Sequence, residues 1–338
     1  MANKKIGEQT FELCNPPSIA GHANVVGQKE GAGPLHNSFD LIGTDDAFGE
    51  RSWEKAEMEM QKRALTMALE KAKQIPATLD FLFAGDLLNQ CISAGYAARG
   101  TGIPFFGLYG ACSTMAESLG LAAMLLDGGF GEWGAAVTSS HFCSAERQYR
   151  TPLEYGGQRT PTSQWTATAA GAVVLAKNGD GPYITHVTPG RIQDKGIKDA
   201  NNMGAAMAWA AYDTISRHLR DTKRSTSYYD LIVTGDLGKL GMEIIIELFA
   251  GDDIDLTPNY TDCGVLLFDL KGQDVHCGAS GCGCSASVLT GYLLNGMRAG
   301  RWQNILFCGT GALHSPTSLG QGESIPGICH AVAISTSK

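Results

Sequence analysis

The feature that most constrains the fold is the alternation of short apolar runs with longer helical patterns. Apolar residues recur on one face of the segment 53–73, from Ala56 to Ala68, as in an amphipathic helix. Apolar runs typical of strands fall at 18–26, 79–85, 104–109, 133–140 and 169–176, and further helical patterns fall at 92–99 and 113–126. Strands separated by helices predict parallel β-α-β units. The 43 glycines among 338 residues suit the many tight turns of such an α/β protein.

The second half of the chain repeats this organisation after about residue 180. It contains a helical pattern at 204–220, a strand at 229–236, a helix at 240–249 and a further strand at 264–270. Two short stretches also resemble each other across the halves: 125–138 resembles 293–308, and 168–179 resembles 261–272. We therefore expect two related halves, residues 1–178 with Cys112 and residues 179–338, with a site between them where helix starts converge.

Composition excludes several classes of partner. The formal charge is −8, so nucleic acid and anionic lipid, which need a basic face, are poor partners. The first residues lack an apolar signal core, and no window approaches the run of about 18 apolar residues that spans a membrane. The ten cysteines are irregularly spaced, which is typical of buried thiols in a reducing compartment. We expect a protein that stays inside the cell.

Cys112 lies where the apolar strand 104–109 meets the helix 113–126, in the run Gly-Ala-Cys112-Ser-Thr. The unpaired amides and positive end of that helix would point at the sulfur, which favours a thiolate and also an anionic ligand. The residue is therefore a candidate nucleophile or a ligand contact. The alternative is a buried thiol without a role.

Two further groups of side chains could serve a site. The segment 139–150 follows a strand and emerges at the same sheet edge as Cys112, so His141, Arg147 and Arg150, together with Arg159, could neutralise a carboxylate. The alternative is a solvated loop whose arginines pair with local acids. A second group, His276, Cys277, Cys282 and Cys284, is a weak zinc signal because it lacks a second ligand pair. No glycine motif has the form of a phosphate loop.

The order of these elements resembles the thiolase and ketoacyl-synthase superfamily over nearly the whole chain. The resemblance is carried by Gly-Ala-Cys112-Ser before a helix, by the late Gly281-Cys-Gly-Cys-Ser-Ala-Ser helix start, and by the closing strand 306–312. It implies a duplicated βαβαβαββ layered α/β fold that is usually dimeric. Within the superfamily, the chain is most similar to the stage V sporulation protein AD family. That similarity implies a spore former, and a protein that binds dipicolinic acid and helps to move it into the developing spore.

The resemblance also assigns positions within the site. Cys112 matches the acyl-carrying nucleophile of the superfamily. The two partner positions, which normally carry histidine or asparagine, fall at Cys282 and Asp236, and Cys308 approximates the second cysteine of thiolases. The loss of one catalytic base costs a factor of about 10² to 10⁴ in rate, so loss of both positions argues against condensation. Cys282 and Cys284 could equally serve only close packing.

The resulting hypothesis is a thiolase-like protein that binds pyridine-2,6-dicarboxylate, free or as its calcium chelate, without a cofactor or bound metal of its own. The expected ligand-binding residues are Cys112, Ser113, His141, Arg147, Asp236, Cys282 and Cys308. Phe106, Tyr109 or Phe142 could pack against the ring. The expected partners are membrane subunits of a spore transport assembly, at the cytoplasmic face of the forespore inner membrane, and a second copy in a homodimer. The alternatives are an acyl-thioester enzyme with Asp236 or His141 as its base, and a scaffold in which the pocket is a relic.

Overall fold

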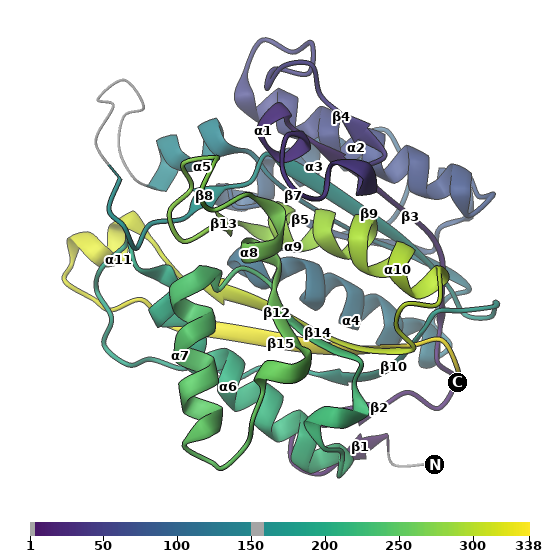
Figure 1. Cartoon of the computed structure of the whole chain (residues 1–338). Helices are drawn as coiled ribbons and strands as arrows, with labels where there is room; N and C mark the ends of the chain where they lie inside the picture. The colour runs from purple at the N-terminus through teal and green to yellow at the C-terminus, as the bar shows by residue number, and fades with distance from the viewer. Residues whose placement is uncertain (1–3, 150–158) are drawn as a thin grey trace.

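The structure, a computed structural model, describes residues 4–149 and 159–338. Its helices and strands form layers, with the helices α4 (Thr114–Asp127) and α9 (Cys282–Val288) at the middle of the molecule (Figure 1). Helix α4 packs against strands from both halves of the chain, and α2 (Trp53–Lys71) and α6 (Met203–Thr222) cover the outer faces. This arrangement is the layered α/β fold that the sequence predicted.

The remaining helices and the strands complete these layers. The other α-helices are α1 Gln28–Gly31, α3 Ile92–Ala98, α5 Phe142–Tyr149, α7 Gly238–Ala250, α8 Cys263–Leu267, α10 Leu294–Arg298 and α11 Pro316–Gly320. The strands are β1 Lys5–Ile6, β2 Thr10–Glu12, β3 Ser18–Val26, β4 Leu41–Ile42, β5 Phe81–Gly85, β6 Phe105–Leu108, β7 Trp133–Ser140, β8 Trp165–Thr166, β9 Ala169–Ala176, β10 Tyr183–Thr188, β11 Leu231–Thr234, β12 Tyr260–Asp262, β13 Ala279–Ser280, β14 Asn304–Ala312 and β15 Gly327–Ser335.

The main sheet consists of two similar five-strand arrangements. Its order is β12-β11-β14-β15-β10-β3-β9-β7-β5-β6, and the two arrangements meet where Tyr183 pairs with Ser18. In each arrangement the three outer strands are parallel and the two inner ones are antiparallel. Strands from before residue 178 make one arrangement, and β10 and later strands make the other, whereas the division of the chain into two domains stays a prediction.

Three apolar clusters follow these layers. The largest lies between the two arrangements and includes Met115, Leu119 and Leu289, all fully buried. A second lies between α2 and the β3-β9-β7-β5 face, and a third between α6 and the β15-β14-β11 face. Apolar burial on both faces explains why α4 is apolar around most of its circumference, whereas α2 is buried along one stripe.

Two details of the predicted topology are wrong. The expected strand at 264–270 is helix α8, because the Asp262 side chain accepts a hydrogen bond from the Gly264 amide and caps a helix there. The strand in this region is β12, which is three residues long and ends just before α8. The segments 168–179 and 261–272 therefore do not have equivalent structures, because the first contains strand β9 and the second contains helix α8. Strands β7 and β9 are also antiparallel rather than parallel, because the connection through α5 returns the chain along the neighbouring strand.

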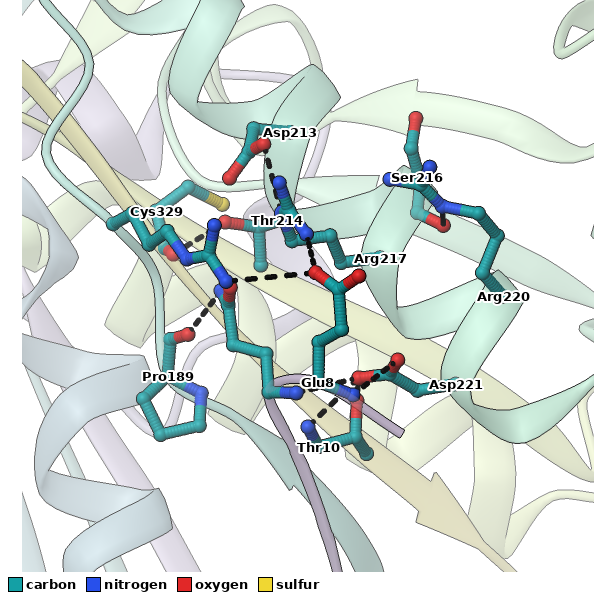
Figure 2. A network of polar contacts seen from close by, with 12 residues as sticks. Glu8, Thr10, Pro189, Asp213, Thr214, Ser216, Arg217, Arg220, Asp221 and Cys329 are labelled. Carbon is teal, nitrogen blue, oxygen red and sulfur yellow. Dashed lines mark hydrogen bonds and ion pairs between the residues drawn. The ribbon is translucent and has the colours of Figure 1, made fainter. Parts of the chain in front are cut away.

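The N-terminal segment is fastened to the end of α6 by one carboxylate (Figure 2). The Asp221 side chain accepts hydrogen bonds from the amides of Glu8, Gln9 and Thr10, each at 2.9 Å. The Glu8 side chain pairs with Arg217 on the same helix. These contacts hold β1 and β2 beside β10, far along the sequence from where the segment begins.

Candidate functional site

Cys112 lies in a tight turn between β6 and α4. The preceding Ala111 has φ 52°, a left-handed conformation that is unfavourable for a residue with a Cβ. The turn is held by the Ser113 hydroxyl and amide, which both donate to the Gly110 carbonyl at 2.7 and 3.2 Å. The side chain of Cys112 is only 5% exposed, and that remaining surface faces a pocket.

The pocket is bounded by elements of both halves. It encloses about 450 Å³ of space not filled by protein atoms, its mouth included. Its lining combines apolar side chains with hydroxyl, carboxyl and imidazole groups: Leu87, Ala111, Cys112, Ala145, Glu146, Tyr149, Thr166, Met203, Ser280, Ala312 and His314. The rings of Tyr149 and His314 lie 5.4 Å apart, so one part of the wall is aromatic. Such a mixture suits a small, flat ligand with polar groups.

Asp236 and Cys282 lie beside Cys112, whereas their role in binding a ligand stays a prediction. The Asp236 carboxyl is fully buried and accepts from the Gly281 amide at 2.8 Å and the Thr310 hydroxyl at 2.9 Å. Cys282 packs with Cys112, Leu87 and Ala145 in one small cluster. Gly281, with φ 101°, begins α9 so close to β7 that a Cβ would lie 2.7 Å from the Ser140 hydroxyl.

The electrostatics of this group oppose thiolate formation, contrary to the prediction from the helix start. Burial and the adjacent Asp236 carboxyl raise the pKa of Cys112 well above its ordinary value. Burial also raises the pKa of Asp236 to about 6, although the hydrogen bonds it accepts favour its charged form. The desolvation of the sulfur and a neighbouring negative charge therefore outweigh the positive end of α4.

The other predicted site residues do not line the pocket. Both polar groups of Ser113 are used within the turn. His141 is buried elsewhere, where its Nε2 lies 2.7 Å from the Asp46 carbonyl and its ring stacks on Trp53. Arg147 pairs with Glu54 at the surface. These side chains serve local structure in the described chain.

Of three further candidates, two lie outside the pocket lining and one lies outside the described residues. Cys308 is buried in the outer cluster under α6, where it neighbours Cys329 rather than Cys112. Arg159 pairs with Asp274 and lies over the Trp165 ring. Arg150 lies outside the described residues. Within the described ranges no group of three or more histidine, cysteine or acidic side chains is placed to hold a metal ion.

The expected aromatic contacts also differ from those observed. Phe106 stacks on Phe83, and Phe142 stacks on Trp165 with ring centroids 4.0 Å apart. The Tyr109 hydroxyl lies 2.7 Å from that of Tyr149, which is the tyrosine in the pocket wall. Sequence reasoning missed Tyr149 and His314, because their positions depend on how α5 and the segment after β14 fold back over the Cys112 turn.

One sequence signal could have strengthened the prediction for Asp236. Strands β5 and β11 occupy matching places in the two arrangements, and the same tripeptide lies where each strand ends, Gly85-Asp86-Leu87 and Gly235-Asp236-Leu237. Earlier in the same stretches, Asp80 and Asp230 each accept two amides from the start of the neighbouring strand. This repeat is a better record of the duplication than the 168–179 and 261–272 pair.

Comparison with solved structures defines the class of fold. Over 95% of the chain and 99% of the other protein, the structure is similar to Xanthomonas campestris OleA crystallised with lauric acid and lauroyl-CoA, with a TM-score of 0.61 and 15% identity. It is similar to 3-oxoacyl-[acyl-carrier-protein] synthase III from Aquifex aeolicus over 94% and 99% of the two chains, with a TM-score of 0.56 and 13% identity. The fold is that of the thiolase-like ketoacyl synthases.

Sequence comparison then defines the family. Residues 7–335 match the family model described as Stage V sporulation protein AD (SpoVAD). The chain is also 41% identical, over 329 residues and 97% of both chains, to stage V sporulation protein AD of Bacillus subtilis (strain 168). The chain belongs to the SpoVAD family, as its sequence predicted, and its role is in sporulation.

Proposed function

We propose that the Cys112 pocket binds pyridine-2,6-dicarboxylate, or a related small aromatic anion, and that the protein supports uptake of this ligand into the developing spore. The observation that carries the proposal is the pocket wall, in which Tyr149 and His314 offer aromatic faces beside the hydroxyls of Ser280 and Thr166, the latter donating to the Glu146 carboxyl at 3.0 Å. The aromatic faces match a flat ring, and the polar groups around them match substituents at its edge. Membership of a sporulation family supports the spore context.

The same site is poorly suited to carbon–carbon condensation. A condensing enzyme needs a reactive thiolate and groups that move a proton and stabilise an oxyanion. Here the neighbours of Cys112 are a second buried thiol, Cys282, and a carboxyl, Asp236, both with no exposed surface. Because the pKa of Cys112 is raised by its burial and by Asp236, only a small fraction is thiolate at neutral pH. We infer that the pocket serves binding.

We further propose that the protein works with membrane subunits of a spore transport assembly, at the cytoplasmic face of the forespore inner membrane, and as a homodimer. No helix in the described ranges is long and apolar enough to cross a membrane. The homodimer is supported by strand β6, which lies at the end of the sheet order with Phe105 and Phe106 exposed by 38% and 50%. An uncharged sheet edge of this kind is suited to pairing with another strand.

Calorimetric titration with pyridine-2,6-dicarboxylate tests the proposal. The described part of the pocket lining holds no lysine or arginine, so the titration is run with and without calcium, which neutralises the dianion. We expect saturable binding by the wild type that is weakened in Cys112→Ala. Cys308→Ala is the matched control, because it removes an equally buried thiol in the outer cluster, and benzoate is the control ligand.

The outcomes separate the alternatives. Equal binding by the wild type, Cys112→Ala and Cys308→Ala would indicate that the ligand binds outside the Cys112 pocket. No binding in either calcium condition would refute the proposal, and a stable acyl adduct on Cys112 after incubation with an acyl-CoA would favour the acyl-thioester enzyme instead.

A further inference from the structure

Two buried carboxyl groups lie directly behind the pocket and take no part in the contacts described above. Glu57 projects from α2, Asp86 follows β5, and neither has any exposed surface. The Glu57 carboxyl accepts from the Ser139 hydroxyl at 2.8 Å and the Ser144 hydroxyl at 3.0 Å. The Asp86 carboxyl accepts from the amides of Leu88 and Ala94 at 2.8 and 2.7 Å.

No cation compensates these carboxyl groups within the described chain. Neither forms an ion pair there, and the four hydrogen bonds come from neutral hydroxyl or amide groups. On the same two helices, Glu54 of α2 and Arg147 of α5 pair with each other at the surface. Two neighbouring carboxylates without a counter-ion cannot both ionise cheaply in a dry interior, so Glu57 keeps its proton at neutral pH.

The groups that titrate near Glu57 and Asp86 have pKa values different from that of Glu57. Burial and the nearby Asp86 raise the pKa of Glu57 to about 8, and burial raises the pKa of Asp86 to about 6. The pair faces Cys282 from α9, and Asp86 faces Cys91; burial raises the pKa of both thiols, that of Cys91 to about 11. Glu30, whose pKa burial raises to about 7 and which reaches the start of α5 through Thr168, is largely ionised by pH 8, so Glu57 is the carboxyl near α5 that loses its proton about pH 8.

Both carboxyl groups are connected to the pocket wall through the adjacent residue. Ser144, which donates to Glu57, precedes Ala145 and Glu146 on α5, and Asp86 precedes Leu87. Ala145, Glu146 and Leu87 line the pocket. The same carboxyl groups therefore fix α5 to α2 and β7, and fix the turn after β5 to α3.

We propose that Glu57 and Asp86, buried without a cation, are positioning residues whose hydrogen bonds hold α5 and the Leu87 turn in place as walls of the Cys112 pocket. Loss of the Glu57 proton adds a second buried negative charge, loosens the contacts of α5 and weakens ligand binding. The binding part of this inference rests on the proposed function, whereas the effect on α5 does not.

The test compares the wild type with Glu57→Gln, which cannot ionise but keeps an oxygen acceptor for Ser139. Glu59→Gln is the matched control, because Glu59 lies on the same helix and pairs with Arg63 near the surface. Hydrogen exchange of α5 amides, corrected for the intrinsic pH dependence, is measured from pH 6 to 9.5, and the dissociation constant for pyridine-2,6-dicarboxylate is measured in parallel. Asp86→Asn is the second variant if Glu57→Gln does not fold.

We expect corrected exchange of α5 and the dissociation constant to rise about tenfold from pH 7 and to level off above pH 8 in the wild type and in Glu59→Gln, since up to about pH 8 the closed state keeps a Glu57 proton that the open state has already lost. Both should stay flat in Glu57→Gln. A wild type without this rise in α5 exchange, or a Glu57→Gln variant that keeps it, would overturn the inference. Absence of ligand binding at every pH would refute the proposed function alone, because the exchange of α5 still decides the positioning role.

Discussion

Replacing Asp236 by asparagine should make the Cys112 thiol more reactive. At pH 8 the Asp236 carboxyl, with its pKa raised by burial to about 6, is almost fully ionised and opposes formation of a neighbouring thiolate. Removal of such a like charge shifts a buried pKa by about 1 to 3 units, and each unit is a tenfold change in the thiolate fraction. The rate of alkylation should rise by about 10- to 1,000-fold.

The substitution is mild for the fold. The asparagine oxygen still accepts a hydrogen bond, and the Thr310 hydroxyl can turn to accept from the new amide. The burial of Cys112 is unchanged, so the effect reports loss of the carboxyl, through both its charge and its hydrogen bond with the thiol.

The assay follows carboxamidomethylation by iodoacetamide at pH 8, with each cysteine quantified by peptide mass spectrometry. Cys14 is exposed and serves as the internal reference in both proteins. In the wild type we expect Cys112 to react more slowly than Cys14, and in Asp236→Asn the ratio should move toward Cys112. An unchanged ratio would refute the electrostatic reasoning, and a wild-type Cys112 that reacts faster than Cys14 would revive the acyl-thioester enzyme.

Three further predictions concern stability. Asp262→Asn should lower the free energy of unfolding by about 2 to 4 kcal/mol in urea titration, because the fully buried carboxyl accepts three backbone amides and one hydroxyl. Gly190→Ala should lower the melting temperature, since a Cβ would lie 1.8 Å from the Cys329 carbonyl oxygen, whereas Gly95→Ala, in helix α3 with open space around it, should leave it unchanged or raise it. Burial raises the pKa of Asp221, but the hydrogen bonds that its carboxylate accepts from residues 8–10 outweigh burial and hold the pKa below its ordinary value. Its contribution is therefore present above the unfolded pKa and lost as pH falls through the folded one, so Asp221→Asn should flatten the acid limb of a stability profile measured by circular dichroism.

Much of the architecture could be predicted because it rests on local patterns. The strands β5, β7 and β9 and the helices α2 and α4 lie within a few residues of their expected positions, since each has a clear apolar period and recognisable ends. The segment 264–270 was read as a strand because its apolar run is continuous, and apolar period alone does not distinguish a buried strand from a buried helix. The feature that distinguishes the helix is the N-cap at Asp262, a single side chain that an apolar pattern does not record.

The site was predictable only in part, for a related reason. Cys112, Asp236 and Cys282 follow strand ends or begin central helices, so the topology alone brings them together. Tyr149 and His314 reach the pocket from the ends of peripheral segments, and no spacing in the sequence indicates how those segments return. His141 and Arg147 looked suitable by residue type, but local partners, Asp46 and Glu54, hold them elsewhere.

The duplication of the fold bears on why only one cysteine faces a pocket. A cysteine lies at or just before the start of each central helix, near a carboxyl group that follows a strand of the other half: Cys112 lies beside Asp236, and Cys282 beside Asp86. The two arrangements differ in what lies over the cysteine. The Cys282 thiol donates to the Ser139 carbonyl at 2.9 Å and is fully buried, whereas Cys112 keeps a small exposed surface toward Tyr149. On the side of buried Cys282, Glu57 lies near Asp86, and these two carboxyl groups hold the wall of the pocket that Cys112 faces. In this molecule one half of the duplicated site therefore supports the other, which accounts for two buried carboxyl groups that a purely structural core would not need.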